Sequence, residues 1–210
     1  MNKKSFSASI TATILGMLLT TSANANLISN GSFEEATGTA LGGSGGWNYY
    51  LASNVPGWNG DNIELWINRT PNAYEGDYHA ELNAHGQNSG AWSISQTFST
   101  ILGYSYDVFF AYSARSGSTS SSNEVFNVSV DGQSWNISDH VTGSWKTFSQ
   151  SFTATGNSAT LTFTSVVPFS GTLGNFIDDV RVTVPEPGAL ALLGLGLLGP
   201  GVARKRNKSA

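Results

Sequence analysis

The chain of 210 residues contains no cysteine. Disulfide bonds and thiol chemistry are therefore excluded. A segment of the length of residues 26–183 buries roughly two-thirds of the surface of its unfolded chain, which is enough for stability without disulfides. We therefore expect one domain over residues 26–183, held together by a hydrophobic core.

Basic side chains are few outside the two ends of the chain. Residues 26–183 contain four of them, Arg69, Arg115, Lys146 and Arg181, against 13 acidic side chains, so the formal charge of this segment is −9. A nucleic-acid-binding protein needs a basic patch that displaces counterions from phosphate groups. Nucleic acid is therefore not an expected partner.

Short catalytic motifs are also lacking. The chain has no H-E-x-x-H and no glycine-rich phosphate loop between a strand and a helix, and GGSGG at 42–46 is expected to be a flexible loop. His79 with Glu81, and Asp139 with His140, are conceivable acid/base pairs outside any recognisable arrangement. We predict that the protein is not an enzyme. A glycosidase stays open, because sequence does not show the separation of two carboxylates.

The N-terminus has the order of features typical of a secretory signal. Lys3 and Lys4 precede an apolar run at 10–19, and Ala23-Asn24-Ala25 follows as a small-x-small cleavage site. The run is too short for a membrane-spanning helix. We therefore predict a signal peptide at 1–25 and export of the remaining chain.

A second apolar run lies at 188–203, near the C-terminus. As a helix its 16 residues would be about 24 Å long, against a hydrocarbon core of about 30 Å. The basic side chains that follow it, Arg204, Lys205, Arg206 and Lys208, would stay in the cytoplasm by the positive-inside rule. The segment is therefore predicted to be a short transmembrane helix that holds the chain in the inner membrane transiently.

Val184, Pro185, Glu186 and Pro187 precede this helix. This order of Pro-Glu-Pro motif, apolar helix and basic tail resembles the PEP-CTERM sorting signal of Gram-negative bacteria. The resemblance implies that residues 184–210 are processed by an exosortase-type membrane protease. It also implies release to the cell surface or extracellular matrix of a species that makes exopolysaccharide, as in a biofilm. A plain membrane anchor is the alternative.

The segment between the two signals is predicted to be all-β. Alternating apolar and polar residues, separated by turn signals, predict short strands and no helix. The expected strands cover residues 27–33, 62–68, 78–83, 92–98, 104–115, 125–130, 145–153, 160–165 and 176–184. Eight or more such strands indicate a two-sheet β-sandwich, a jelly roll, with long polar loops at 36–57 and 116–123.

Several short motifs carry a second resemblance. NLISNGSFEE, VPGW, HAELNA, SISQTF and FIDDVRV, in this order, resemble the galactose-binding-like jelly rolls, in particular carbohydrate-binding modules of families 4, 9 and 22. The resemblance implies that the first and last strands meet, commonly around a structural calcium ion, and that Trp58 is a structural tryptophan.

The acidic residues of the last strand agree with a metal site. Strict alternation in FIDDVRV places Asp178 on the same face as Phe176, Val180 and Val182, and a carboxylate on an apolar face needs a partner. Glu34, Asp178 and Asp179 are therefore candidate calcium ligands, since calcium prefers oxygen. Pairing of Asp178 or Asp179 with Arg181, or capping of a loop, is the alternative.

Aromatic side chains indicate the function. Sugar-binding surfaces use flat rings for stacking and polar groups for hydroxyls. The candidate platforms are Trp47, Tyr49 and Tyr50 in the long loop, Trp66 on the face opposite Ile63 and Leu65, and Trp135 after a turn. The candidate polar partners are Glu64, Glu81 and Arg115. We therefore predict non-catalytic binding of polysaccharide.

Two further function classes stay open. A matrix or surface protein that works only through protein contacts fits the same composition. TLTFTS at 160–165 places Thr160, Thr162 and Thr164 on one face, as in an ice-binding surface, although threonines that face outward are also ordinary strand formers.

Overall fold

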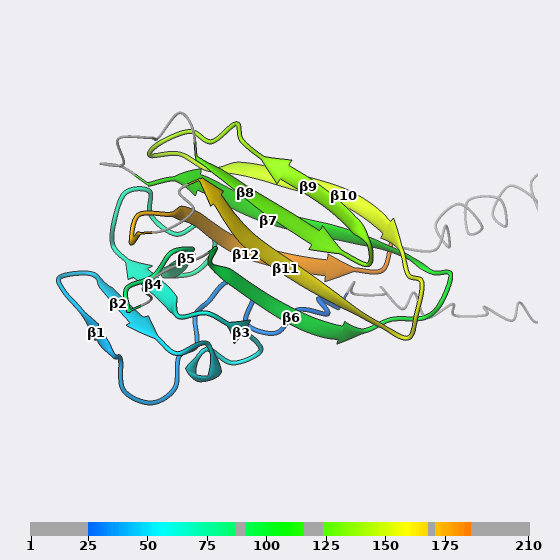
Figure 1. Cartoon of the computed structure of the whole chain (residues 1–210), viewed down its shortest axis with the longest axis horizontal. Coiled ribbons are helices and arrows are strands. Elements are labelled where there is room, and N and C mark those ends of the chain that lie inside the picture. Colours follow the sequence, from blue (N-terminus) through cyan, green and yellow to red (C-terminus); the bar gives the residue numbers. More distant parts are fainter. Residues whose placement is uncertain (1–24, 87–90, 116–123, 168–170, 186–210) are drawn as a thin grey trace, which may run out of the picture.

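The computed structural model describes residues 25–86, 91–115, 124–167 and 171–185 (Figure 1). Most of the two terminal signals lies outside these ranges, including Ala23, Glu186, Pro187, Arg204, Lys205 and Arg206. Within the described ranges, no helix is long and apolar enough to cross a membrane.

Two antiparallel sheets face each other and form a β-sandwich, which confirms the predicted fold class (Figure 1). The seven-stranded sheet contains, in spatial order, β1 (Gly42–Gly43), β2 (Trp47–Tyr50), β4 (Ile63–Ile67), β5 (Tyr78–Glu81), β12 (Asn175–Thr183), β7 (Ser105–Ala114) and β10 (Lys146–Thr153). The five-stranded sheet contains β3 (Asn59–Gly60), β6 (Ser93–Ser99), β11 (Ser158–Val167), β8 (Val125–Val130) and β9 (Gln133–Ile137). A single-turn 3-10 helix, Ala52–Asn54, follows β2.

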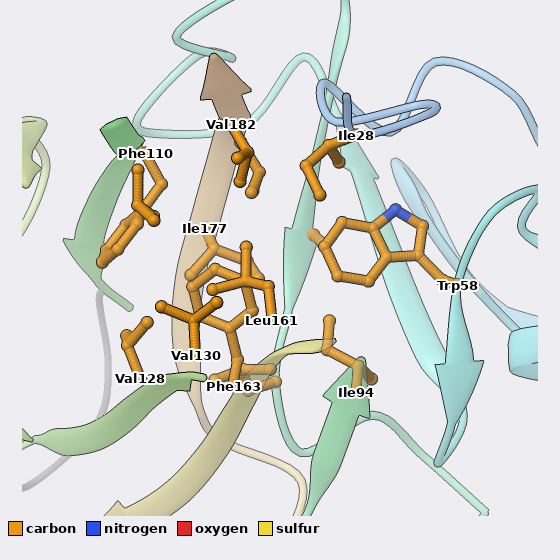
Figure 2. Packing of buried hydrophobic residues seen from close by; sticks show 14 of the residues in the cluster. Ile28, Trp58, Ile94, Phe110, Val128, Val130, Leu161, Phe163, Ile177 and Val182 are labelled. Atoms are coloured by element: carbon orange, nitrogen blue, oxygen red, sulfur yellow. The ribbon is translucent and has the colours of Figure 1, made fainter. Parts of the chain in front are cut away.

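The core lies between the two sheets. Along β11, Leu161 and Phe163 point inward and are fully buried, because alternate side chains of a strand lie on opposite faces. Figure 2 shows these two side chains packed with Val128 of β8 and Ile177 of β12. Burial of the core residues by both sheets supplies the main stabilising term of the domain.

Trp58 is part of this core and is 2 % exposed. Its ring stacks on Phe33 with a centroid distance of 4.9 Å. Its indole N–H donates to the carbonyl of Asn30 at 3.0 Å. Trp58 therefore fastens the N-terminal turn to the sandwich, in agreement with a structural role.

The predicted strand at 27–33 is wrong. These residues form turns, in which Asn30 and Phe33 have φ of 49° and 58°, a left-handed conformation that interrupts a strand. The two ends of the domain still meet, because the backbone N–H of Leu27 donates to the carbonyl of Val182 at 2.8 Å.

The predicted loop at 36–57 contains two paired strands. β1 and β2 form a short hairpin, and β2 continues into the sheet through its pairing with β4. Gly45 and Gly46, with φ of 49° and 109°, make the tight turn between β1 and β2. The glycines expected to give a flexible loop therefore give a turn, which places Trp47 in a strand.

A β-bulge in β12 corrects the predicted alternation of FIDDVRV. The pairing with β7 shifts between Asp178 and Arg181, and Asp179 has φ of 48°. Asp178 consequently lies on the outer face of the sheet, whereas Val180 and Val182 pack in the core. The prediction that these two valines share a face with Asp178 is wrong.

The outer face of the five-stranded sheet carries Thr160, Thr162 and Thr164, as the TLTFTS pattern predicts. Their cross-strand neighbours on this face are Thr97, Ser95 and Ser93 of β6 and Ser129 and Asn127 of β8. Thr97 and Thr160 are joined by a hydrogen bond of 2.8 Å between their hydroxyl groups. The face is thus uncharged and polar, and the ice-binding alternative stays untested.

Candidate functional site

The outer face of the seven-stranded sheet gathers most of the predicted sugar-binding residues. Cross-strand register aligns the side chains of β2, β4 and β5 in two rows. One row contains Trp47, Trp66 and His79, and the other contains Tyr49, Glu64 and Glu81. We call the two rows and the side chains that contact them the outer-face cluster: Trp47, Tyr49, Glu64, Trp66, His79, Glu81, His85, Arg115, Trp145 and Phe176.

Aromatic rings follow one another across the strands in this cluster. Trp47 stacks on His85 with a centroid distance of 4.5 Å and lies 6.4 Å from Trp66. Trp66 in turn lies 6.4 Å from His79, which meets the edge of Trp145 at 5.4 Å. The rings therefore form a continuous aromatic layer from β2 to the segment that precedes β10.

Glu64 holds two of these rings in position. The indole N–H of Trp66 donates to Glu64 Oε1 at 2.9 Å, and His85 Nδ1 lies 2.7 Å from Glu64 Oε2. The carboxylate of Glu64 is fully buried. A buried carboxylate needs such partners, so the ring orientations and the burial of Glu64 depend on each other.

Glu81 forms a second buried network with Arg115. Arg115 Nη1 lies 2.7 and 3.0 Å from the two carboxylate oxygens, and the backbone N–H of Gly174 donates to Glu81 Oε1 at 2.7 Å. Burial raises the pKa of Glu81, while the charge of Arg115 opposes this shift. The guanidinium carbon of Arg115 also lies 4.7 Å from the centroid of the Trp66 ring.

His79 acts as an aromatic ring rather than as an acid or base. It packs edge-to-face against Phe176 and Trp145. Neither of its ring nitrogens has a hydrogen-bond partner among the described residues. Burial lowers the pKa of His79 to about 4, so the ring is neutral at pH 7. The His79–Glu81 acid/base alternative has no support in this geometry.

Accessibility divides the cluster into supporting and reachable side chains. Glu64 and Glu81 are 0 % and 1 % exposed and Trp66 is 8 % exposed, so the prediction of an exposed platform at Trp66 is wrong. On this side of β4 and β5, His85 contacts Glu64 and Trp145 contacts His79. The partly exposed members are Trp47, Tyr49, His85, Arg115 and Trp145.

Two predicted platforms lie away from the cluster. Tyr50 pairs with Ile63 on the inner face of the sheet and packs against the core. Trp135 lies in β9 of the other sheet, where its ring contacts Phe148 at 5.4 Å edge-to-face. Both rings are therefore partly buried against the hydrophobic core.

The predicted metal ligands hold a loop. Asp178 Oδ2 accepts backbone hydrogen bonds from Tyr74 and Glu75 at 2.6 and 3.1 Å. Glu34 Oε1 accepts from Asp77 and Tyr78 at 2.9 and 2.8 Å. The two carboxylates thus fasten both ends of the segment 74–78.

Asp179 has a different partner, since its Oδ2 lies 2.6 Å from Arg181 Nη2. The described residues contain no group of three or more His, Cys, Asp or Glu side chains that could hold a metal. Glu34, Asp178 and Asp179 are each engaged by protein groups in this structure, and backbone carbonyls would have to complete a calcium shell. The calcium site stays a prediction.

A polar pocket of about 510 Å³ lies beside this loop, away from the aromatic layer. Asn30, Glu75, Asp179 and Arg181 are among its lining residues. Burial, together with the charge of Glu75, raises the pKa of Asp179, and the charge of Arg181 opposes the shift. The pocket has few apolar walls, which makes it a poor match for a stacked sugar ring.

Several residues of the site were missed from the sequence. His85 follows the predicted strand at 78–83, and Trp145 is the first residue of the predicted strand at 145–153, which begins one residue later in the structure. Tyr49 is among the predicted platforms, but the glycine-rich segment before it hid the short β2 strand that contains it. Alternation in NYY was the signal that could have identified Tyr49 as the neighbour of Trp47 on the same face.

A protein-family model matches residues 26–183, almost the whole described region. The chain belongs to the DUF642 family. The description of this family is "protein of unknown function". A second model, the PEP-CTERM protein-sorting motif, matches residues 183–207 and confirms the predicted sorting signal. This motif implies export and exosortase-dependent sorting to the cell surface.

No match was found among curated proteins. An arabinose-bound α-L-arabinofuranosidase is similar to the DUF642 domain in fold, with a TM-score of 0.52 and 13 % identity over 77 % of this chain and 27 % of that chain. A family 61 carbohydrate-binding module in complex with β-1,4-galactotriose aligns with a TM-score of 0.46 and 17 % identity, over 77 % and 99 % of the two chains. At these identities the likeness concerns the fold alone.

Proposed function

We propose that the DUF642 domain binds extracellular polysaccharide without cleaving it, through the outer-face cluster. The observation that carries this proposal is the aromatic layer on the outer face, in which Trp47 is partly exposed and its cross-strand neighbour Trp66 is held by the buried Glu64. A ring held in a fixed orientation loses little conformational entropy when a sugar stacks on it. Trp47 is the stacking platform, and Trp66 supports it.

The absence of cleavage is part of the proposal. Glu64 and Glu81 face each other across β4 and β5, yet both are buried and bonded to other protein groups. A glycosidase needs two carboxyl groups that reach opposite sides of one glycosidic bond. Because the carboxylates of Glu64 and Glu81 are buried and already bonded to protein groups, a supporting role is favoured over an acid/base role.

The test is affinity electrophoresis of the full chain through gels that contain the exopolysaccharide of the host and a panel of other glycans. We expect retardation that weakens at least about fivefold in Trp47→Ala, because a stacking contact contributes on the order of 1 kcal/mol. Retention on a polymer comes from several weak contacts acting together.

Tyr104→Ala is the matched control, since Tyr104 is exposed and precedes β7 at the end of that strand opposite Arg115. Its retardation should equal that of the wild type. Unretarded migration of the wild type through every glycan would favour the alternative, a matrix protein that acts through protein contacts. Released oligosaccharides would assign the protein to the glycosidases.

Processing is the second part of the proposal. In a Gram-negative host, the chain is held transiently in the inner membrane and cut at the Pro-Glu-Pro motif by an exosortase-type protease, after which it joins the cell surface or biofilm matrix. We expect an intact mass that lacks residues 1–25 and the segment beyond 187. A surface form that retains residues 204–210 would contradict this processing.

A further inference from the structure

The four basic side chains of this acidic domain are unevenly distributed. Two of them lie near one tryptophan, since the guanidinium carbons of Arg69 and Arg115 are 5.9 and 4.7 Å from the centroid of the Trp66 ring. In a segment with a formal charge of −9, half of the basic side chains therefore lie in the outer-face cluster or beside it: Arg115 is a member, and Arg69 lies next to Trp66.

Three of the four basic side chains have a carboxylate partner. Arg115 pairs with Glu81, Lys146 with Asp139, and Arg181 with Asp179. Among the described residues, Arg69 has no such ion pair. Its charge is therefore not neutralised locally by a protein group.

Arg69 is nevertheless held in place. Its guanidinium group donates to the carbonyl of Gly45, in the turn that precedes Trp47. A Cβ atom on Gly46 would come within 2.8 Å of Arg69 Nε, so a side chain at this position would displace the arginine from its present place against the turn. The cation is thus fixed beside the aromatic layer while its side chain stays exposed.

A fixed and unpaired guanidinium group is suited to a carboxylate, because its planar array of N–H donors matches the two carboxylate oxygens. Resting on the proposed function, we propose that the polysaccharide bound at the outer-face cluster is anionic, and that Arg69 pairs with the carboxylate of a uronate unit stacked at Trp47. Arg69 then determines specificity for the acidic sugar, and Trp47 provides affinity for its ring.

The experiment compares gels that contain polygalacturonate or alginate with gels that contain methyl-esterified polygalacturonate, all in EDTA so that divalent cations cannot bridge the chains. We expect the wild-type full chain to be retarded more strongly by the charged polymers. Arg69→Gln should weaken binding to them about tenfold, since it removes a hydrogen bond between two charged groups. Arg69→Lys should recover part of the loss.

Arg181→Gln is the matched control. It also removes one positive charge, and its guanidinium carbon lies 4.3 Å from the centroid of an aromatic ring, Phe109. Because Arg181 is already paired with Asp179, we expect binding equal to the wild type. If both variants lost the same amount of binding, the loss would come from the change in net charge alone. That result would overturn the assignment of Arg69.

The outcomes separate this inference from the proposed function. Equal retention by charged and esterified polymers, unchanged in Arg69→Gln, would overturn the anionic class and leave polysaccharide binding intact. No retention by any glycan would reject both. Because Arg69 is exposed, melting curves should show that Arg69→Gln folds like the wild type.

Discussion

Replacing Arg115 with methionine should lower the free energy of unfolding by about 3–5 kcal/mol, because removal of one partner of a buried ion pair leaves the other charge uncompensated. Glu81 is 1 % exposed and is held by Arg115 Nη1 at 2.7 Å. The loss is measured by equilibrium denaturation in urea at pH 7.

The double variant Glu81→Gln with Arg115→Met is the control. Once both charges are gone, no buried charge remains, so the double variant should be clearly more stable than Arg115→Met alone. If Arg115→Met cost less than about 1 kcal/mol, the ion pair would behave as a surface pair, which would contradict its description as a buried network.

Asp178→Asn should lower the free energy of unfolding by about 1–3 kcal/mol, because the amide presents an N–H₂ group to backbone donors that now bond to a carboxylate. Burial raises the pKa of Asp178 to about 7, so the experiment is performed at pH 8, where the folded protein carries this charge. Melting curves in EDTA and in calcium are compared for both proteins.

The same curves test the calcium prediction. We expect an equal loss in the two media, since the oxygens of Asp178 already accept hydrogen bonds from Tyr74, Glu75 and Asp179. A ligand that binds only the native state raises the melting temperature. A calcium-dependent rise in the wild type that is absent in Asp178→Asn would therefore establish the predicted metal site and contradict a purely loop-holding carboxylate.

In the outer-face cluster, the outward position of a side chain on its strand does not make that side chain accessible. Trp66 and Glu64 are on the outward side of β4, as the alternation of the sequence predicted. Segments distant in the chain, around Trp145 and Arg115, then pack over this side. An outward side chain is exposed only if no loop covers it, and a single sequence does not show where its loops fold back.

Of the predicted platforms Trp47 and Trp66, Trp47 is the one that stays partly exposed. Its position depends on β2, whose strand character comes from its pairing with β4 and not from its own short sequence. The bulge at Asp179 had a similar effect in β12, since one extra residue reversed the faces of the residues after it.

The amino-acid sequence by itself determined the all-β class, the sorting signal and the inward packing of Leu161 and Phe163, because these features depend on local order and on the two-residue period of a strand. The tertiary structure alone decided which rings and charges meet. Arg69 lies beside Trp66 and bonds to the glycine turn before Trp47, and Arg115, just after β7, reaches Glu81 34 residues away in the chain. Such contacts depend on sheet register and loop packing, which are set by the whole chain and not by any segment of it.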